Sequence, residues 1–172
     1  SIGGLVGMNH LGQVVQSFAD VDVTGVEKIG GLTGWNHYGS ITESYARGAV
    51  LGIGNKIGGL VGRNSFSTIT NSYSTGNTFG STPTGGLIGL NESSVVQNSY
   101  WDTQESSRST SDGGSGKTTT EMKNIATFRD GGWLFTGVWH IDMKPNSPAN
   151  DGYPSLAWEG LAHGENLLVT TS

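Results

Sequence analysis

The stretch Ile57-Gly58-Gly59-Leu60-Val61-Gly62, followed by Asn64, decides the fold because the chain contains it in four versions. The other three versions are Ile2-Gly3-Gly4-Leu5-Val6-Gly7, Ile29-Gly30-Gly31-Leu32-Thr33-Gly34 and Thr84-Gly85-Gly86-Leu87-Ile88-Gly89. The first glycine stands at positions 3, 30, 58 and 85, so the period is 27 or 28 residues. A fixed period of this length is typical of a solenoid, in which each repeat stacks on the next.

Each repeat also carries a second pattern. Eight residues after the Asn, a serine precedes an aromatic residue in every copy: Ser17-Phe18, Ser44-Tyr45, Ser72-Tyr73 and Ser99-Tyr100. Short segments of β-branched and aromatic residues, bounded by Gly, Asn or Ser, predict strands between turns. No stretch before Asp102 has the apolar spacing of a helix. We therefore predict an all-β fold, a parallel β-helix (β-solenoid) of about four 27–28-residue coils, with three strands and three corners in each coil.

The repeats also predict which residues stack on one another. Strand alternation places the leucine of the first pattern on the inner face, which predicts a structural ladder of Leu5, Leu32, Leu60 and Leu87. A second ladder is expected from Tyr45, Tyr73 and Tyr100, because like side chains on stacked strands pack together. The glycines beside the leucines either allow a close approach of the opposite wall or simply form turns. The asparagine suits a corner, because it tolerates a left-handed backbone.

Composition and charge exclude several classes of partner. Hydrophobic residues are 34% of the chain and glycines number 29, which fits a thin repeated core better than one large core. The formal net charge of −5 argues against nucleic acid and against an anionic membrane surface. No apolar run approaches the ~18–20 residues of a membrane span, so we expect no membrane insertion by this segment. The lack of cysteine excludes disulfides and thiolate metal sites.

The repeat pattern ends after Tyr100. The solenoid is predicted to cover residues 1–103, followed by a C-terminal capping region over 104–160 and a linker or frayed end over 161–172. Four of the five tryptophans lie after residue 100, where they could cover the open end of the stack.

Two details of the capping region follow from its sequence. The polar stretch 101–116 predicts a mobile loop. Thr118 and Glu121 form a capping box, which predicts one short helix at about 119–127 as the only helix in the chain.

The candidate motifs for catalysis and cofactor binding each lack a required residue or spacing. Gly116-Lys117-Thr118 resembles a phosphate-binding loop, but the position that requires the first glycine is Ser111. His10 and His37 share a column without a third ligand, which favours a surface pair over a metal site. No pair of carboxylates with the spacing needed for glycan cleavage stands out. We expect no catalytic residue, no metal and no cofactor.

The residues around the repeated asparagine are the candidates for binding. The position two residues after it holds Leu11, Tyr38, Phe66 and Ser93, and the position before it holds Met8, Trp35, Arg63 and Leu90. If this corner faces solvent, its aromatic and basic groups suit sugar stacking or protein contact. If it is buried, the same residues are core. The predicted binding residues are Trp35, Tyr38, Arg63 and Phe66.

The two patterns together, Gly-Gly-Leu-Val-Gly-Xaa-Asn and then Ile-Xaa-Asn-Ser-Tyr-Ser-Thr-Gly, resemble the GLUG-motif repeat of large bacterial surface and secreted proteins. These include filamentous-haemagglutinin-like adhesins and non-catalytic regions of some IgA-cleaving peptidases. The resemblance covers roughly residues 1–103 and departs from the usual aliphatic residues at Thr33 and Thr84. It implies an extracellular β-solenoid at the bacterial cell surface or in a secreted protein, and it implies no activity.

Two functions remain open at this point. The first is a structural and adhesive segment that gives reach and a contact surface. Its candidate partners are a host or matrix glycan or protein, or neighbouring copies of itself. The second is an accessory or spacer region of a secreted enzyme, either a peptidase or a glycan-active β-helix. The first is favoured because the variable positions are mostly small and uncharged, without convergent titratable groups.

Overall fold

The computed structural model describes residues 1–142 and 149–162. The chain divides into two compact units, Ser1–Met122 and Lys123–Ser172. We call them the solenoid unit and the C-terminal unit, and describe each by itself.

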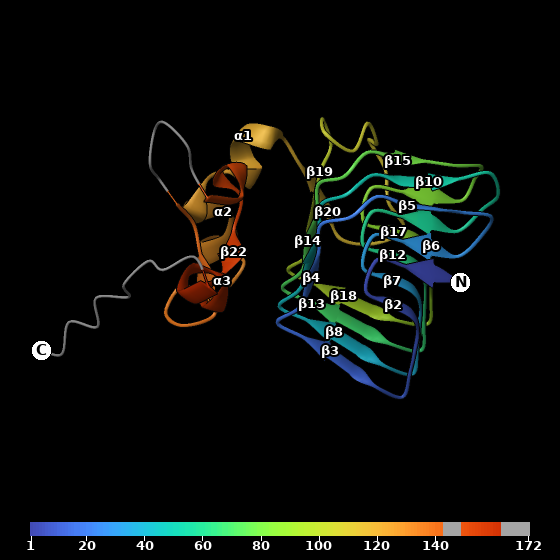
Figure 1. Cartoon of the computed structure of the whole chain (residues 1–172), viewed down its shortest axis with the longest axis horizontal. Helices are drawn as coiled ribbons and strands as arrows, with labels where there is room; N and C mark the ends of the chain where they lie inside the picture. Colours follow the sequence, from blue (N-terminus) through green and yellow to red (C-terminus); the bar gives the residue numbers. More distant parts are fainter. Residues whose placement is uncertain (143–148, 163–172) are drawn as a thin grey trace, which may run out of the picture. The chain divides into compact units, whose positions relative to one another are not determined.

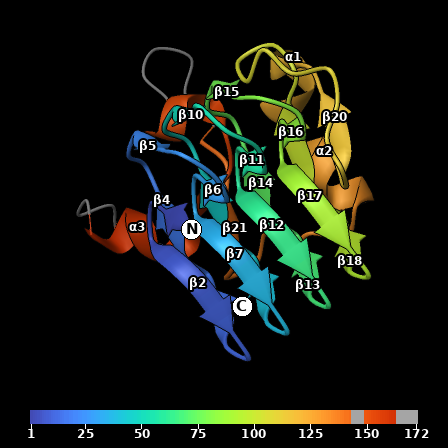
Figure 2. The ribbon, with the colours of Figure 1, turned by 90° about the vertical axis from the view of Figure 1, so that its right-hand side faces the viewer.

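The solenoid unit is a β-solenoid of about four coils, as the repeats predict (Figures 1 and 2). Its strands pair in parallel with the same segments of the neighbouring coils. Each of the first three coils contains five short strands, not the three predicted, because the backbone also pairs between adjacent coils on either side of the predicted corners.

The strands form five sheets along the stack. The first contains β1 (Ile2–Gly3), β6 (Ile29–Gly30), β11 (Ile57–Gly58) and β16 (Thr84–Gly85). The second, which we call the long-strand sheet, contains β2 (Val6–His10), β7 (Thr33–His37), β12 (Val61–Ser65) and β17 (Ile88–Glu92). Figure 2 shows these four strands side by side.

The other three sheets complete the coils. One contains β3 (Gln13–Val15), β8 (Ser40–Thr42), β13 (Thr68–Thr70) and β18 (Val95–Gln97). The next contains β4 (Phe18–Ala19), β9 (Tyr45–Ala46), β14 (Tyr73–Ser74), β19 (Tyr100–Asp102) and β20 (Ser115–Lys117). The last contains β5 (Val23–Gly25), β10 (Val50–Gly52) and β15 (Thr78–Phe79).

The paired glycines of the repeat allow the backbone and the opposite wall to come close. A Cβ placed on Gly31 would collide with the carbonyl oxygen of Gly59 in the next coil and lie 2.8 Å from the Cβ of Ala46 across the coil. Neither Gly31 nor its neighbour Gly30 has a positive φ. The interpretation as close approach is therefore confirmed at these positions, and Gly31 also lies at the bend between β6 and β7.

Three of the four predicted core leucines are completely buried. Leu32, Leu60 and Leu87 have no exposed surface and pack in one cluster with Ile41 and other apolar residues of the interior. The prediction for Leu5 is wrong, because 50% of its surface is exposed. Leu5 lies in the first coil, where a neighbouring coil packs against only one side of it.

The prediction that the repeated asparagine forms a corner is wrong. Its side chain points into the coil. The amide nitrogens of Asn9, Asn36 and Asn64 each donate to the amide oxygen of the next asparagine at 2.8 Å, so that the ladder ends at Asn91. Hydrogen bonding between buried amides outweighs the tolerance of asparagine for turns.

The corners lie elsewhere and have a left-handed backbone. The first corner of each coil is at Leu11 (φ 57°), Tyr38 (φ 52°), Phe66 (φ 51°) and Ser93 (φ 49°). Other left-handed corner residues are Gln16, Glu43, Asn71 and Asn98 in the second corner, and Lys28 and Lys56 before β6 and β11. None of these is glycine, so each of these corners holds a side chain in a conformation that L-residues adopt with difficulty.

The tyrosine column stacks as predicted and begins one coil earlier, at Phe18. The ring centroids of Phe18 and Tyr45 are 5.1 Å apart, and those of Tyr45 and Tyr73 are 4.9 Å apart with nearly parallel planes. Tyr100 pairs in register with Tyr73. Ala46 belongs to the inner core cluster, so alternation places the ring of Tyr45 on the outer side of its sheet.

The polar loop after β19 does not extend freely from the last coil. Its strand β20 pairs with β19, and the backbone amide of Gly86 donates to the carbonyl of Thr110 at 3.0 Å. The Ser111 hydroxyl accepts from the backbone amide of Ile88 at 2.8 Å. The loop thus satisfies backbone groups at the edge of the last coil, and the solenoid unit continues past residue 103 to Met122.

The prediction of one helix at 119–127 as the only helix is wrong, because this stretch forms two helices, α1 (Thr119–Met122) and α2 (Ile125–Asp130), and the C-terminal unit has a further helix, α3 (Ala157–Ala162). The capping box is confirmed, because the Thr118 amide donates to Glu121 Oε2 at 2.8 Å and the Glu121 amide donates to Thr118 Oγ1 at 3.3 Å. Asn124 separates the helices. Its backbone is extended, and its side chain accepts from the Ala126 amide at 3.0 Å, which starts a new helix.

The C-terminal unit contains α2, β21 (Trp139–His140), η1 (Ala149–Gly152), β22 (Ser155–Leu156) and α3 (Ala157–Ala162). Strands β21 and β22 pair antiparallel. Trp133 lies 4.7 Å from Phe128 and 4.5 Å from Trp139, measured between ring centroids. These rings form an aromatic cluster within the unit.

Two predictions for the C-terminal part stay open. That residues 104–160 act as the cap of the solenoid remains a prediction for the part after Met122. In the predicted linker 161–172, α3 includes 161 and 162, and 163–172 lie outside the described residues. Within 1–142 and 149–162, no helix combines the length and apolar character needed to cross a bilayer.

Candidate binding surface

The candidate surface is the outer side of the long-strand sheet together with the corner that follows it. In β7, the side chain of Asn36 points inward, so its neighbours Trp35 and His37 point outward. The corner faces solvent, since the exposed fractions are 71% for Leu11, 50% for Tyr38 and 53% for Phe66. The alternative that these corner residues belong to the core is therefore wrong.

The corner forms a ridge of stacked apolar side chains. The ring centroids of Tyr38 and Phe66 are 5.1 Å apart with an interplanar angle of 12°. Both residues have positive φ, which is unusual for bulky side chains and costs roughly 1–2 kcal/mol per residue. Because the other corners of the coils share this left-handed backbone, the feature that is typical of an interaction surface is the exposed apolar cluster.

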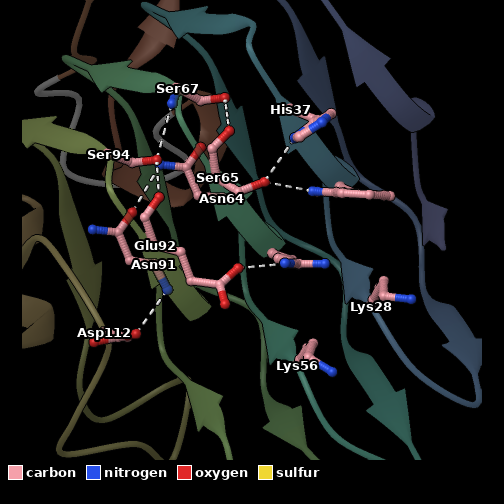
Figure 3. Close-up of polar contacts among 12 residues, drawn as sticks. Lys28, His37, Lys56, Asn64, Ser65, Ser67, Asn91, Glu92, Ser94 and Asp112 are labelled. Carbon is pink, nitrogen blue, oxygen red and sulfur yellow. Dashed lines mark hydrogen bonds and ion pairs between the residues drawn. The ribbon is translucent and has the colours of Figure 1, made fainter.

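Trp35 is held in place by two neighbours on the same side of the sheet. Its Nε1 donates to the Ser65 hydroxyl at 2.8 Å, and the same hydroxyl lies 3.0 Å from Nδ1 of His37 (Figure 3). The rings of Trp35 and His37 are 4.7 Å apart. The indole is half-buried and therefore fixed rather than free to rotate.

Two cations lie against the Trp35 ring. The guanidinium carbon of Arg63 is 4.9 Å from the ring centroid, and the Lys28 ammonium is 5.8 Å from it. Both distances are within the range of cation–π attraction. Arg63 Nε also donates to Glu92 Oε2 at 2.6 Å.

Lys28 pairs with its neighbour Glu27 in sequence. Its ammonium lies 2.7 Å from Glu27 Oε1. The hydrogen bond and the charge of Lys28 lower the pKa of Glu27 below the ordinary value of 4.5. Glu27 therefore stays ionised beside Lys28 at neutral pH.

The structure brings all four predicted binding residues onto one surface. Tyr38 contacts Phe66 and Trp35 contacts Arg63, and these two pairs are linked through His37, whose ring is 4.4 Å from that of Tyr38. Sequence reasoning missed the parts played by Lys28, His37 and Glu92. The signal was present, because each belongs to a column of repeated positions, but only coordinates show which columns touch.

His10 and His37 form the stacked surface pair that the sequence favours. Their ring centroids are 5.2 Å apart with an interplanar angle of 22°. In the described part of the chain, no group of three histidine, cysteine, aspartate or glutamate side chains is placed to hold a metal ion.

A comparison with family models places a known motif on one coil. The family model described as "The GLUG motif" matches residues 54–79. This range contains β11, β12, β13, β14 and β15, which are the five strands of the third coil. The chain therefore contains a GLUG motif, and in this structure one motif corresponds to one coil. Comparisons with curated proteins and with solved structures gave no match.

Proposed function

We propose that the chain is a non-catalytic structural and adhesive segment of a large bacterial cell-surface or secreted protein. In this proposal the stacked coils provide reach, and the outer side of the long-strand sheet provides the contact surface. The observation that carries the proposal is the exposed ridge of Leu11, Tyr38 and Phe66 on left-handed corners.

The interior supports a role in reach. Backbone hydrogen bonds join each coil to the next in five sheets, and the asparagine ladder adds an inner line of amide hydrogen bonds. Each coil contacts only its neighbours, so that stability adds up along the stack and length can increase without a larger core. Such a column suits the display of a surface at a distance.

The ridge supports a role in contact. A serine, as at position 93 of the fourth coil, fills the same corner without exposing apolar surface. Tyr38 and Phe66 instead expose rings, which is unfavourable in water unless a partner covers them. The carboxylates of the neighbouring surface, Glu27 and Glu92, are engaged in ion pairs, which favours binding over acid–base catalysis. Candidate partners are a host or matrix glycan or protein, or a neighbouring copy.

The test is a pair of corner substitutions that remove the contact without weakening the fold. In Tyr38→Asn/Phe66→Asn, both rings are lost but asparagine tolerates the left-handed backbone. We expect the double variant to lose binding on arrays of glycans and matrix proteins while its thermal stability stays equal or rises. The matched control is Glu43→Asn, which changes another left-handed corner of the second coil and should leave binding intact.

Two results would count against the proposal. If the wild-type chain binds no glycan, matrix protein or copy of itself, the adhesive role is wrong, and the spacer region of a secreted enzyme becomes the better function. If the double variant binds as tightly as the wild type, the ridge is not the contact surface.

A further inference from the structure

Three of the chain's nine basic residues gather on the candidate surface or in the corner beside it, before β6 and β11. Lys28 and Arg63 both contact the ring of Trp35. Lys56 occupies the same corner as Lys28 in the next coil, since both have positive φ and precede the paired strands β6 and β11 (Figure 3). Positive charge is gathered here although the whole chain has a formal net charge of −5.

The donors of this cluster are only partly used within the described residues. Arg63 uses Nε for Glu92, which leaves its two terminal nitrogens available for a planar, two-point interaction with an oxyanion. The Lys56 ammonium has one hydrogen bond, to the neutral amide oxygen of Asn55 at 3.2 Å. Against three cations stand two carboxylates, Glu27 and Glu92, so a net positive charge remains.

Trp35 positions two of these cations, Arg63 and Lys28. Its indole is fixed through the Ser65 hydroxyl, and the ring attracts Arg63 and Lys28 toward its surface. A cation that is already oriented loses less rotamer freedom when it binds an anion. The arrangement is therefore a pre-organised set of donors on a rigid sheet.

We propose that Lys28, Lys56 and Arg63 form a binding site for the acidic groups of a polyanionic glycan, either carboxylates or sulfates. The inference rests on the proposed contact function and names the chemistry of its partner. Beside the cations, the partly exposed imidazole of His37, whose Nδ1 is engaged by Ser65, provides a partner for a sugar hydroxyl. The two lysines are one coil apart, about 4.8 Å, so they suit a linear chain that carries repeated charges along the stack.

The geometry disfavours nucleic acid as the polyanion. Single-stranded nucleic acids bind by stacking bases on free aromatic faces. Tyr38 and Phe66 stack on each other, and the cations lie against the ring of Trp35. A sugar chain needs only the edges of these rings and the charged groups beside them.

The experiment measures affinity of the whole chain for four immobilised polymers. Polygalacturonate offers carboxylates, dextran sulfate offers sulfates, dextran offers neither, and polyglutamate offers carboxylates on a peptide. We expect binding to polygalacturonate or dextran sulfate, with the stronger of the two identifying the acidic group, and binding should weaken as salt shortens the screening length from about 10 Å at 0.1 M to about 3 Å at 1 M.

Charge variants separate this site from general attraction. Arg63→Gln and Lys56→Gln should each weaken binding about tenfold, which corresponds to about 1.4 kcal/mol. Glu92→Gln should strengthen binding, since it removes a competing anion from Arg63, and a purely structural role of the pair would not give this sign. The matched control is Lys117→Gln, which removes one positive charge from β20 and should leave binding unchanged.

Several results would overturn the acidic-glycan site, and some of them would leave the contact function standing. Equal binding to dextran or to polyglutamate, or an equal loss in Lys117→Gln and Lys56→Gln, overturns the acidic-glycan site. If binding depends on Tyr38 and Phe66 but not on Arg63 or Lys56, the acidic-glycan site is wrong and the contact function stands. If the wild type binds none of these polymers but binds a neutral glycan or a protein through the ridge, the same conclusion holds. If it binds nothing, both proposals fail.

Discussion

The two sides of the long-strand sheet differ in how strictly the sequence repeats. On the inner side, the position of Asn36 holds asparagine in all four coils, whereas the outer position beside it holds Met8, Trp35, Arg63 and Leu90. The inner asparagine bonds to the same residue of the next coil, so that a change in one coil removes partners from two others. The outer residue faces solvent or a ligand, so it is free to differ. Repetition on the inner side of this sheet therefore marks stability, and variation occurs on the outer side, where we propose contact with a partner.

The largest loss of stability is expected when an asparagine in the middle of the inner asparagine ladder is replaced. Asn64→Ala leaves the amide nitrogen of Asn36 and the amide oxygen of Asn91 without their partners. We expect the free energy of unfolding to fall by about 2–6 kcal/mol, since each orphaned buried group costs roughly 1–3 kcal/mol. Chemical denaturation measures it. Asn9→Ala, at the end of the ladder, orphans one such amide and should cost about half as much. Equal losses at both positions would contradict the ladder.

The leucine column gives the next largest effect and tests burial alone. Leu60→Ala removes a completely buried side chain and should lower the free energy of unfolding by about 2–5 kcal/mol. Leu5→Ala changes the same position in the first coil, where half of the side chain is exposed, and should cost less than about 1 kcal/mol. Denaturation of the two variants side by side checks this difference. A loss below about 0.5 kcal/mol at Leu60 would match a surface position and invert the assignment of the faces.

Thr33 is a polar residue at a position of the inner side that is otherwise aliphatic, and we expect its replacement to stabilise the fold. It is completely buried, and its hydroxyl oxygen has no hydrogen-bond partner, while the same position in the next coil holds Val61. Thr33→Val should therefore stabilise the fold by about 1 kcal/mol, because it removes an unsatisfied buried polar group. The matched control is Thr84→Val, which loses a hydrogen bond from Oγ1 to the Ser81 carbonyl at 2.5 Å and should not stabilise. A melting temperature that falls in Thr33→Val would show that its hydroxyl is satisfied.

The inner side is also the part of the fold that the sequence predicts best. The leucine column could be predicted because a stacked position repeats its residue type, and the tyrosine column, although it lies on the outer side of its sheet, could be predicted for the same reason. Asn64 was assigned to the wrong place, since the turn preference of asparagine is visible in one repeat, whereas its bond to Asn91 requires two stacked coils. Leu5 has the same sequence pattern as Leu60, but half of its surface is exposed in the first coil, which its own repeat does not indicate.

The outer side is predictable only in part. The columns of Tyr38 and Trp35 follow from the period, and their residue types indicate contact. That Lys28 reaches the ring of Trp35 does not follow, because Lys28 lies in the corner before β6 and Trp35 lies in β7, and the period alone does not give the direction of a corner side chain. The polar loop after Tyr100 was predicted to be mobile from its composition, but its backbone groups bond to the last coil, which composition does not record.

The smallest effect is expected at the ion pair of Glu27 and Lys28, which lies on the outside of the wall. Lys28 lowers the pKa of Glu27 in the folded chain, so the pair contributes stability above the ordinary pKa of 4.5 and loses that contribution as the pH falls through the lower folded value. The stability difference between the wild type and Glu27→Gln should therefore favour the wild type at pH 7, shrink below pH 4.5, and be reduced in 1 M salt. Denaturation curves across this pH range measure it. A difference as large as that of Asn64→Ala, or one that persists under acid, would mean that the outer wall contributes to stability as the inner wall does, and the division between the two sides would not hold.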